Sequence, residues 1–122
     1  MLQIVHNMVY IRWLEDLRTL LLAEHLPLEE QIASGYSPVL TRTDIQYKWP
    51  VRFGDAPTGL MWMSHLGATK WQVQAEIVVG EKTAAAATQW GYFADLRSLR
   101  PTRIPQQLRD RYQQAFNDPR NN

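Results

Sequence analysis

Residues 6–25 read HNMVYIRWLEDLRTLLLAEH, without proline or glycine, and this stretch decides the fold. Its large apolar residues recur at the spacing of one helix face: Tyr10, Leu14, Leu17 and Leu21. Further apolar residues widen that sector: Ile11, Trp13, Leu20 and Leu22. We therefore expect a long helix that is buried on most of its circumference. Asn7 is its candidate N-cap, and Pro27 follows its expected end.

After Pro38 the apolar period changes from that of a helix to two, which predicts a long, half-buried strand over residues 39–49. Three further strands are expected over residues 60–66, 71–79 and 83–93, and the short turns between them indicate an antiparallel meander. The run Ala84–Ala87 favours a helix by propensity. It follows a hairpin signal and leads into aromatic residues, so we expect a strand there.

A final amphipathic helix is expected over residues 104–116, opened by the Ile104-Pro105 pair. The order of elements is then one long helix, one long strand, a meander and a short helix. An antiparallel sheet wrapped around the long helix buries both apolar faces. The sequence thus predicts one α+β domain spanning residues 1–122.

Composition narrows the functional classes. Thirteen Lys and Arg residues against twelve Asp and Glu give a net charge of +1, which argues against a nucleic-acid-binding protein. No apolar stretch is long enough to span a membrane, and residues 1–10 do not resemble a secretory signal. The absence of cysteine excludes disulfides and thiolate nucleophiles and fits a reducing cytoplasm. Three scattered histidines make no metal motif, so we expect neither metal nor cofactor.

The long helix also carries a recognisable pattern. Asn7, Tyr10, Trp13, Glu15 and Arg18 fit a segment of the type Asn-x-x-Tyr-x-x-Trp/Phe-x-Glu-x-x-Arg. A segment of this type opens the central helix of hotdog-fold acyl-CoA thioesterases of the 4-hydroxybenzoyl-CoA thioesterase family. The present stretch resembles that segment. Two later segments, DIQYKWPVRFGD at 44–55 and the Leu-Arg-Pro pattern at 99–105, are similar to the same family in the same order.

The resemblance implies a hotdog fold and the hydrolysis of an acyl- or aroyl-CoA thioester without a cofactor. Members of the family pair their sheets edge to edge and place the active site at the subunit interface. A homodimer or homotetramer whose partner is a small acyl-CoA substrate is therefore expected.

One feature of the family pattern is missing. Its catalytic Asp typically stands about seven residues before the helix-opening Asn, which here falls just before Met1, and Gln3 occupies the glycine position of that pattern. The first strand of the family sheet is missing as well. We expect either that the chain starts late or that it is a shortened member with altered function.

Thioester hydrolysis needs a base or nucleophile and donors for the developing oxyanion. The amides of Asn7 and Met8 at the helix N-terminus are the candidate donors, and the alternative is that Asn7 only caps the helix. Glu15 is the candidate base that replaces the family Asp. An intrahelical ion pair, Glu15–Arg18 or Arg12–Asp16, is the competing interpretation. His6 is a second candidate base, or a solvated side chain near the chain start.

The candidate substrate-binding residues are Tyr10, Trp13, Tyr47 and Arg52. Packing in the core or between subunits is the alternative role for the aromatic ones. An arginine cluster near the C-terminus could meet CoA phosphates or simply be solvated. Two further functions stay open beside the thioesterase: a hotdog protein that only binds a hydrophobic or CoA-linked ligand, and an oligomeric scaffold.

Overall fold

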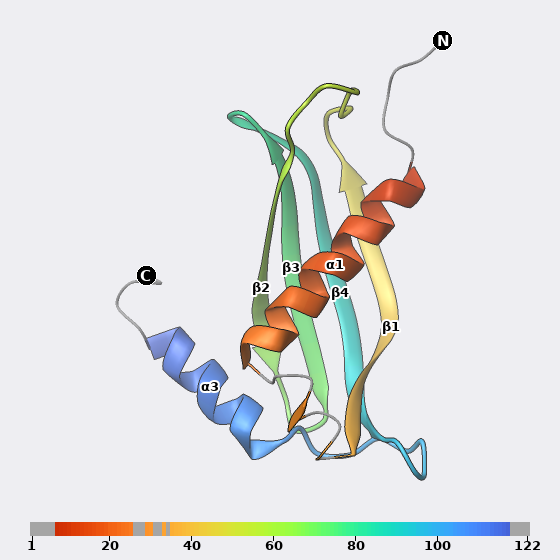
Figure 1. Ribbon diagram of the computed structural model, residues 1–122, viewed down its shortest axis with the longest axis vertical. Helices are drawn as coiled ribbons and strands as arrows, with labels where there is room; N and C mark the ends of the chain where they lie inside the picture. The colour runs from red at the N-terminus through yellow and green to blue at the C-terminus, as the bar shows by residue number, and fades with distance from the viewer. Residues whose placement is uncertain (1–6, 26–28, 31–32, 34, 118–122) are drawn as a thin grey trace.

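The computed structural model describes residues 7–25, 29–30, 33 and 35–117 (Figure 1). Its elements follow in chain order: α1 (Asn7–His25), β1 (Tyr36–Tyr47), β2 (Thr58–Leu66), β3 (Lys70–Val79), β4 (Lys82–Asp95) and α3 (Gln106–Asn117). The strands form one antiparallel sheet in the order β1-β4-β3-β2. The predicted meander is confirmed as β2, β3 and β4, and the long first strand returns to pair with β4.

The alanine run lies in β4, as the hairpin signal predicted. Ala85 and Ala87 are buried with Gln89, while Ala86 and Thr88 point to the other face. Small side chains on this central strand let α1 approach the sheet closely, because a larger residue would hold the helix away. Burial of one strand face therefore overrides the helix propensity of alanine.

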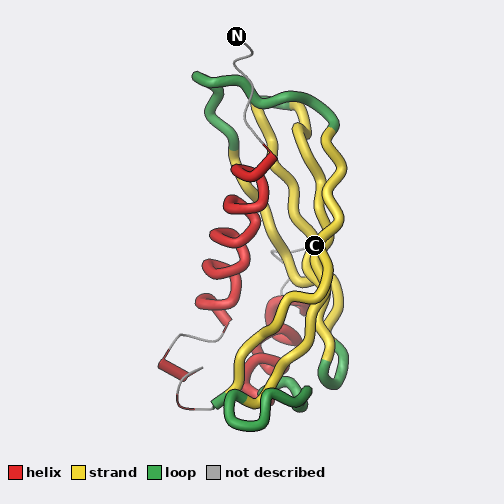
Figure 2. The backbone as a smooth tube through the Cα atoms, turned by 90° about the vertical axis from the view of Figure 1, so that its right-hand side faces the viewer, coloured by secondary structure: helices red, strands yellow, loops and turns green. Residues whose placement is uncertain are grey.

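α1 crosses one face of the sheet diagonally, and no helix of the described residues lies on the opposite face (Figures 1 and 2). Tyr10 and Leu14 are buried between α1 and the sheet, where they pack with Ile77 and Ala75 of β3 and with the alanines of β4. This is the hotdog arrangement that the resemblance implied. Within the described residues, no helix has the length and apolar character needed to cross a membrane.

The expectation that α1 is buried on most of its circumference is wrong. Ile11 is 44% exposed and Leu20 is 66% exposed, because the sheet covers only one side of the helix. The half-buried character expected of β1 is wrong along its middle, where residues 40–44 are all exposed. β1 is an edge strand, and α1 runs away from it toward β2 (Figure 1).

The two ends of the molecule differ. At one end, α3 and the chain before it close a second core cluster through Ile104 and Leu108, which pack with Trp71 and Phe93. At the other end lie the N-terminal end of α1, the end of β1 and the β3–β4 hairpin (Figure 1). This second end holds most of the residues that the sequence selected as functional.

Candidate functional site

Three aromatic side chains gather near the start of α1. The ring of Tyr10 meets the ring of Trp13 edge to face at 5.3 Å and that of Tyr47 at 5.1 Å. Tyr10 is buried and Tyr47 is 48% exposed, so the cluster runs from the core to the surface. We call Tyr10, Trp13 and Tyr47 the aromatic cluster. It unites three of the four predicted binding residues, from α1 and from the end of β1.

Arg52 lies in the connection that follows β1. Its backbone N–H donates to the Asp55 carboxylate at 2.9 Å, and the Asp55 N–H donates back to the Arg52 carbonyl at 3.1 Å. These two bonds close a tight turn, and the Arg52 side chain is exposed. The neighbouring Val51 is buried in the same core cluster as Tyr10. Arg52 is thereby held at the same end of the molecule as the aromatic cluster.

The N-terminal end of α1 carries the candidate oxyanion donors. The helix begins at Asn7, and no acidic residue stands in its first turn. Met8 is exposed. The N-terminal end of a helix bears partial positive charge and attracts anionic oxygen atoms. The side chain of Asn7 and the whole of His6 lie outside the described residues, so the cap and the second candidate base are not placed.

Glu15 lies on the flank of α1 that faces away from β2. Ile11, Glu15 and Arg18 succeed one another at steps of four and three residues, which puts them on one helix face. Glu15 is exposed. Burial lowers the pKa of Arg18, and the negative charge of Glu15 opposes this shift. Neither of the intrahelical ion pairs weighed from the sequence forms within 4.0 Å in the described part of the chain.

Arg18 turns to the sheet instead of to Glu15. Its Nη1 donates to the Oε1 of Gln89 at 2.7 Å, and the Nε2 of Gln89 donates to the Thr43 hydroxyl at 3.2 Å. Gln89 is the buried polar side chain of the described core, at 2% exposure. This chain of hydrogen bonds links α1 through β4 to the edge strand β1. Sequence reasoning missed it, because the resemblance marked Arg18 only as a motif position.

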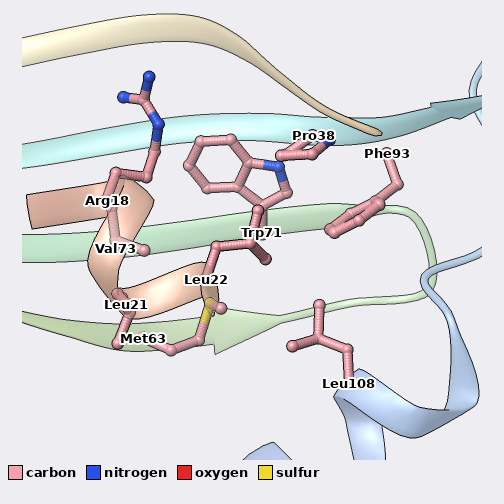
Figure 3. Close-up of a pocket in the computed structure, with 9 residues that line it drawn as sticks. All are labelled: Arg18, Leu21, Leu22, Pro38, Met63, Trp71, Val73, Phe93 and Leu108. Atoms are coloured by element: carbon pink, nitrogen blue, oxygen red, sulfur yellow. The ribbon is translucent and has the colours of Figure 1, made fainter. Parts of the chain in front are cut away.

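Arg18 also borders a small apolar cavity of about 30 Å³ (Figure 3). Pro38 of β1, Trp71 of β3 and Phe93 of β4 form part of its wall. Burial lowers the pKa of Arg18 from its ordinary value, since the guanidinium loses solvation there. No carboxylate lies within ion-pair distance of Arg18 among the described residues.

A larger groove of about 170 Å³ lies on the other flank of α1. Trp13, Leu17 and Leu20 line it from the helix, and Pro57 and Gly59 line it from the start of β2. Asp16 is its acidic residue. Its volume is comparable to the roughly 150 Å³ apolar cavity that holds benzene in another protein. Trp13 thus belongs both to this groove and to the aromatic cluster.

The C-terminal arginines lie at the other end of the molecule, around α3 (Figure 1). Arg109 donates to the Gly67 carbonyl, and Arg111 pairs with Glu30 at 3.3 Å. Arg109 and Arg111 are therefore engaged in contacts around α3, whereas the sequence left open a role at CoA phosphates or simple solvation. In the part of the chain that the structure describes, no three His, Asp or Glu side chains gather as a metal site.

The profile of the thioesterase-like superfamily matches residues 1–112, which is nearly the whole chain. The chain belongs to this superfamily. No curated protein sequence shows significant similarity to it.

Solved structures support the same fold. The 1,4-dihydroxy-2-naphthoyl-CoA thioesterase Slr0204 from Synechocystis has a TM-score of 0.81 at 18% identity, over 95% of this chain and 88% of that one. The gentisyl-coenzyme A thioesterase BH1999 has a TM-score of 0.79 at 18% identity, over 90% and 87%. The hypothetical protein SAV2348 from Staphylococcus aureus, solved in complex with CoA, has a TM-score of 0.86 at 12% identity, over 93% and 73%. At these identities the similarity shows the hotdog fold.

Proposed function

We propose that this member of the thioesterase-like superfamily hydrolyses the thioester of an acyl- or aroyl-coenzyme A. Membership of the superfamily supports the reaction class. Two similar structures are thioesterases of aromatic acyl-CoA compounds, and a third was solved in complex with CoA. The proposed unit is one hotdog domain over residues 1–122, which works in the cytoplasm as a homodimer or homotetramer.

The observation that carries the proposal is the aromatic cluster beside the N-terminal end of α1. In the proposed complex the thioester carbonyl oxygen lies at Asn7 and Met8. As the carbonyl carbon becomes tetrahedral, its oxygen gains negative charge, and the positive end of the helix stabilises that charge. Tyr10, Trp13 and Tyr47 would flank the acyl group, and Arg52 would meet the CoA moiety at the same end.

Glu15 is the proposed general base, and His6 is the second candidate. Glu15 would accept a proton from water while the water oxygen forms a bond to the carbonyl carbon. Collapse of the intermediate breaks the carbon–sulfur bond, and the CoA thiolate takes up a proton as it leaves. The exposure of Glu15 leaves its carboxylate accessible to water. No metal or cofactor enters this reaction.

Thiol release from a panel of aliphatic and aromatic acyl-CoA compounds tests the proposal. The chain contains no cysteine, so a thiol reagent detects only free CoA. We expect turnover that falls at least about 100-fold in Glu15→Gln, since general-base catalysis contributes roughly that much. Asp16→Asn, the neighbouring carboxylate on the other flank of α1, is the matched control. His6→Ala tests the second base.

The outcomes separate hydrolysis from binding alone. Turnover that Glu15→Gln and His6→Ala both leave intact would overturn the assignment of the base. No thiol release from any substrate would overturn the thioesterase proposal. If acyl-CoA compounds then still raise the melting temperature, the chain is a binding protein for CoA-linked ligands.

A further inference from the structure

The loop that follows β4 presents apolar and basic side chains together. Residues 95–103 read DLRSLRPTR, and residues 96–100 are all exposed. Leu96 is 52% exposed and Leu99 is 74% exposed, the highest value among the large apolar side chains of the described chain. The loop projects beyond the end of the strands, at the end of the molecule away from the aromatic cluster (Figure 1). We propose that residues 95–103, called the Leu-Arg loop, bind the surface of a membrane that contains anionic lipids.

Leu99 holds a backbone conformation that packing does not explain. Its φ of 60° lies in the left-handed region, which leucine rarely adopts because its Cβ is then crowded by the backbone. Glycine would take this position at lower cost. The leucine side chain gains little from burial in the core, since most of it is exposed. An uncommon conformation that holds an apolar side chain in solvent points to a function beyond the stability of the fold.

Hydrogen bonds hold the Leu-Arg loop in one shape. The Asp95 carboxylate accepts two backbone N–H groups of the loop, at 2.7 and 3.1 Å. The Leu99 N–H donates to the Asp95 carbonyl at 2.7 Å, and the Asp95 N–H donates to the Arg100 carbonyl at 2.9 Å. The Leu96 N–H donates to the Gly35 carbonyl, just before β1, at 2.8 Å. The leucines are thus presented by a preorganised loop, so binding to a surface requires little further ordering.

The charge of the loop complements an anionic surface. Its three arginines, Arg97, Arg100 and Arg103, are exposed, and none forms an ion pair within 4.0 Å in the part of the chain that the structure describes. Asp95 is the one acidic residue of the loop, so three arginines less one aspartate leave a charge of +2. The Asp95 carboxylate already accepts backbone N–H groups of the loop. The guanidinium groups can each donate two hydrogen bonds to a lipid phosphate.

A lipid surface suits this arrangement better than a protein surface. The leucines stand on a projecting loop, and arginines alternate with them along the chain. A protein partner would need a preformed apolar pocket for each leucine, whereas lipids rearrange around single side chains. The leucines would enter the boundary between headgroups and acyl chains, while the arginine stems let the guanidinium groups stay at the phosphates. Such peripheral binding requires no membrane-spanning segment.

Cosedimentation of the whole chain with lipid vesicles tests the proposal. We expect vesicles of phosphatidylcholine and phosphatidylglycerol to bind the chain at least about tenfold more tightly than vesicles of phosphatidylcholine alone. Added salt should reduce this preference, because it screens the charges. Arg97→Gln and Arg100→Gln should each weaken binding to the anionic vesicles about fivefold. Arg12→Gln, at an exposed arginine of α1, is the matched control and should leave binding unchanged.

Leu99→Asn isolates the apolar contribution to binding. Asparagine tolerates the left-handed region, so the loop should keep its shape. We expect this variant to bind the anionic vesicles about tenfold more weakly, because one apolar side chain no longer leaves water. Leu20→Asn makes the same change at another exposed leucine, on α1, and should leave vesicle binding unchanged.

A fluorescent probe locates the bound surface. The chain contains no cysteine, so Leu99→Cys can be labelled at a single position with nitrobenzoxadiazole, whose emission depends on its surroundings. On anionic vesicles we expect the emission to shift to shorter wavelength, as the probe leaves water. The same probe on Leu20→Cys should show no shift.

Four results would overturn the proposal: no binding to anionic vesicles, equal binding to both kinds of vesicle, binding that Leu99→Asn and Arg100→Gln leave intact, or a probe shift at residue 20 and not at residue 99. Binding of polyglutamate in place of vesicles would also overturn it and assign the loop to an acidic protein. Arginine variants that raise the KM for acyl-CoA and bind vesicles normally would assign these arginines to the substrate instead. The vesicle measurements do not use thiol release, so their outcome is independent of the proposed function.

Discussion

Gln89 is a polar side chain on an otherwise apolar sheet face, and Arg18 is the residue that satisfies it. The amide is almost fully buried, and both of its polar atoms have partners: Oε1 accepts from Arg18 and Nε2 donates to Thr43. A buried amide oxygen that loses its only donor costs more than the hydrogen bond itself contributed, because the oxygen stays desolvated.

We expect Arg18→Met to lower the free energy of unfolding by about 1–3 kcal/mol, since it orphans the Gln89 oxygen. The double variant R18M/Q89L removes both partners and should be more stable than R18M alone. Arg12→Met, an exposed cation on the same helix, is the control and should stay within about 0.5 kcal/mol of the parent. Urea denaturation measures all four proteins. A double variant less stable than R18M would contradict the coupling of these two residues.

Asp95, at the end of β4, titrates differently in the folded chain than in the unfolded one. Its carboxylate accepts the N–H of Ser98 at 3.1 Å and of Arg97 at 2.7 Å. These two bonds lower the pKa of Asp95 in the folded state, the one from Ser98 most. A lowered folded pKa contributes stability above the unfolded pKa of about 3.9, and this contribution disappears as the pH falls through the folded value.

Asp95→Asn keeps an oxygen that can accept both bonds but removes the titration. We expect its free energy of unfolding to fall less steeply than that of the parent between about pH 5 and pH 2. At neutral pH the variant should be somewhat less stable, because a neutral acceptor makes weaker hydrogen bonds than a carboxylate. Urea denaturation across this pH range measures both effects. Parallel pH profiles of the two proteins would show that the pKa of Asp95 is not lowered in the folded state.

The sequence located the aromatic part of the candidate site but not its polar part. Tyr10, Trp13 and Tyr47 came from segments that carry a family pattern, and the structure brings them together. The contact between Arg18 and Gln89 joins residues 71 positions apart. A polar residue inside an alternating strand reads as an outward-facing one unless its partner is known, so no local pattern could reveal this contact.

The helices and strands were predictable because each follows one period. The strand at 82–95 was predictable although its alanine run favours a helix, because the preceding hairpin signal and the following aromatic residues favour a strand. The exposure of α1 was not predictable from periodicity. Ile11 and Leu20 read as core residues because they are apolar, but the sheet reaches only one side of the helix. The pairing of β1 with β4 depends on contacts between distant residues and also lay beyond local patterns.

Two glycines lie where neighbouring groups leave no room for a side chain. A Cβ on Gly91 of β4 would collide with the backbone carbonyl of Val39 and with the Trp71 ring. A Cβ on Gly59 of β2 would meet Leu17 of α1, at 2.8 Å from its Cδ1. The Leu17 side chain can rotate away, whereas a backbone carbonyl in a strand ladder and a buried indole have no such freedom.

We therefore expect Gly91→Ala to destabilise the fold by about 3 kcal/mol or more, and Gly59→Ala by about 1 kcal/mol. Both substitutions add the same methyl group in a strand, so each serves as the matched control for the other. Thermal and urea unfolding give the comparison. Equal losses in the two variants would show that the surroundings of both glycines adjust to the added methyl group to the same extent.

In the described part of the chain, three core clusters share one sheet. One cluster lies beside the N-terminal end of α1 and contains Tyr10, Val51 and Ile77. Another lies at the α3 end and contains Trp71, Phe93 and Leu108. Leu14 packs with Ala75 and Ala87 between them. β3 and β4 run through all three clusters. A destabilising substitution at the α3 end should therefore also destabilise the end that holds the aromatic cluster.

Leu108→Ala tests this coupling at the end farthest from the aromatic cluster. Leu108 is 1% exposed, so its truncation should lower the free energy of unfolding by about 2–5 kcal/mol. Gln107→Ala, its exposed neighbour on α3, should change it by less than about 0.5 kcal/mol. We expect circular dichroism and tryptophan fluorescence to report one coincident transition in urea for both variants, because the sheet is continuous. Two separate transitions in Leu108→Ala would mean that the α3 end unfolds alone and that the end with the aromatic cluster folds without it.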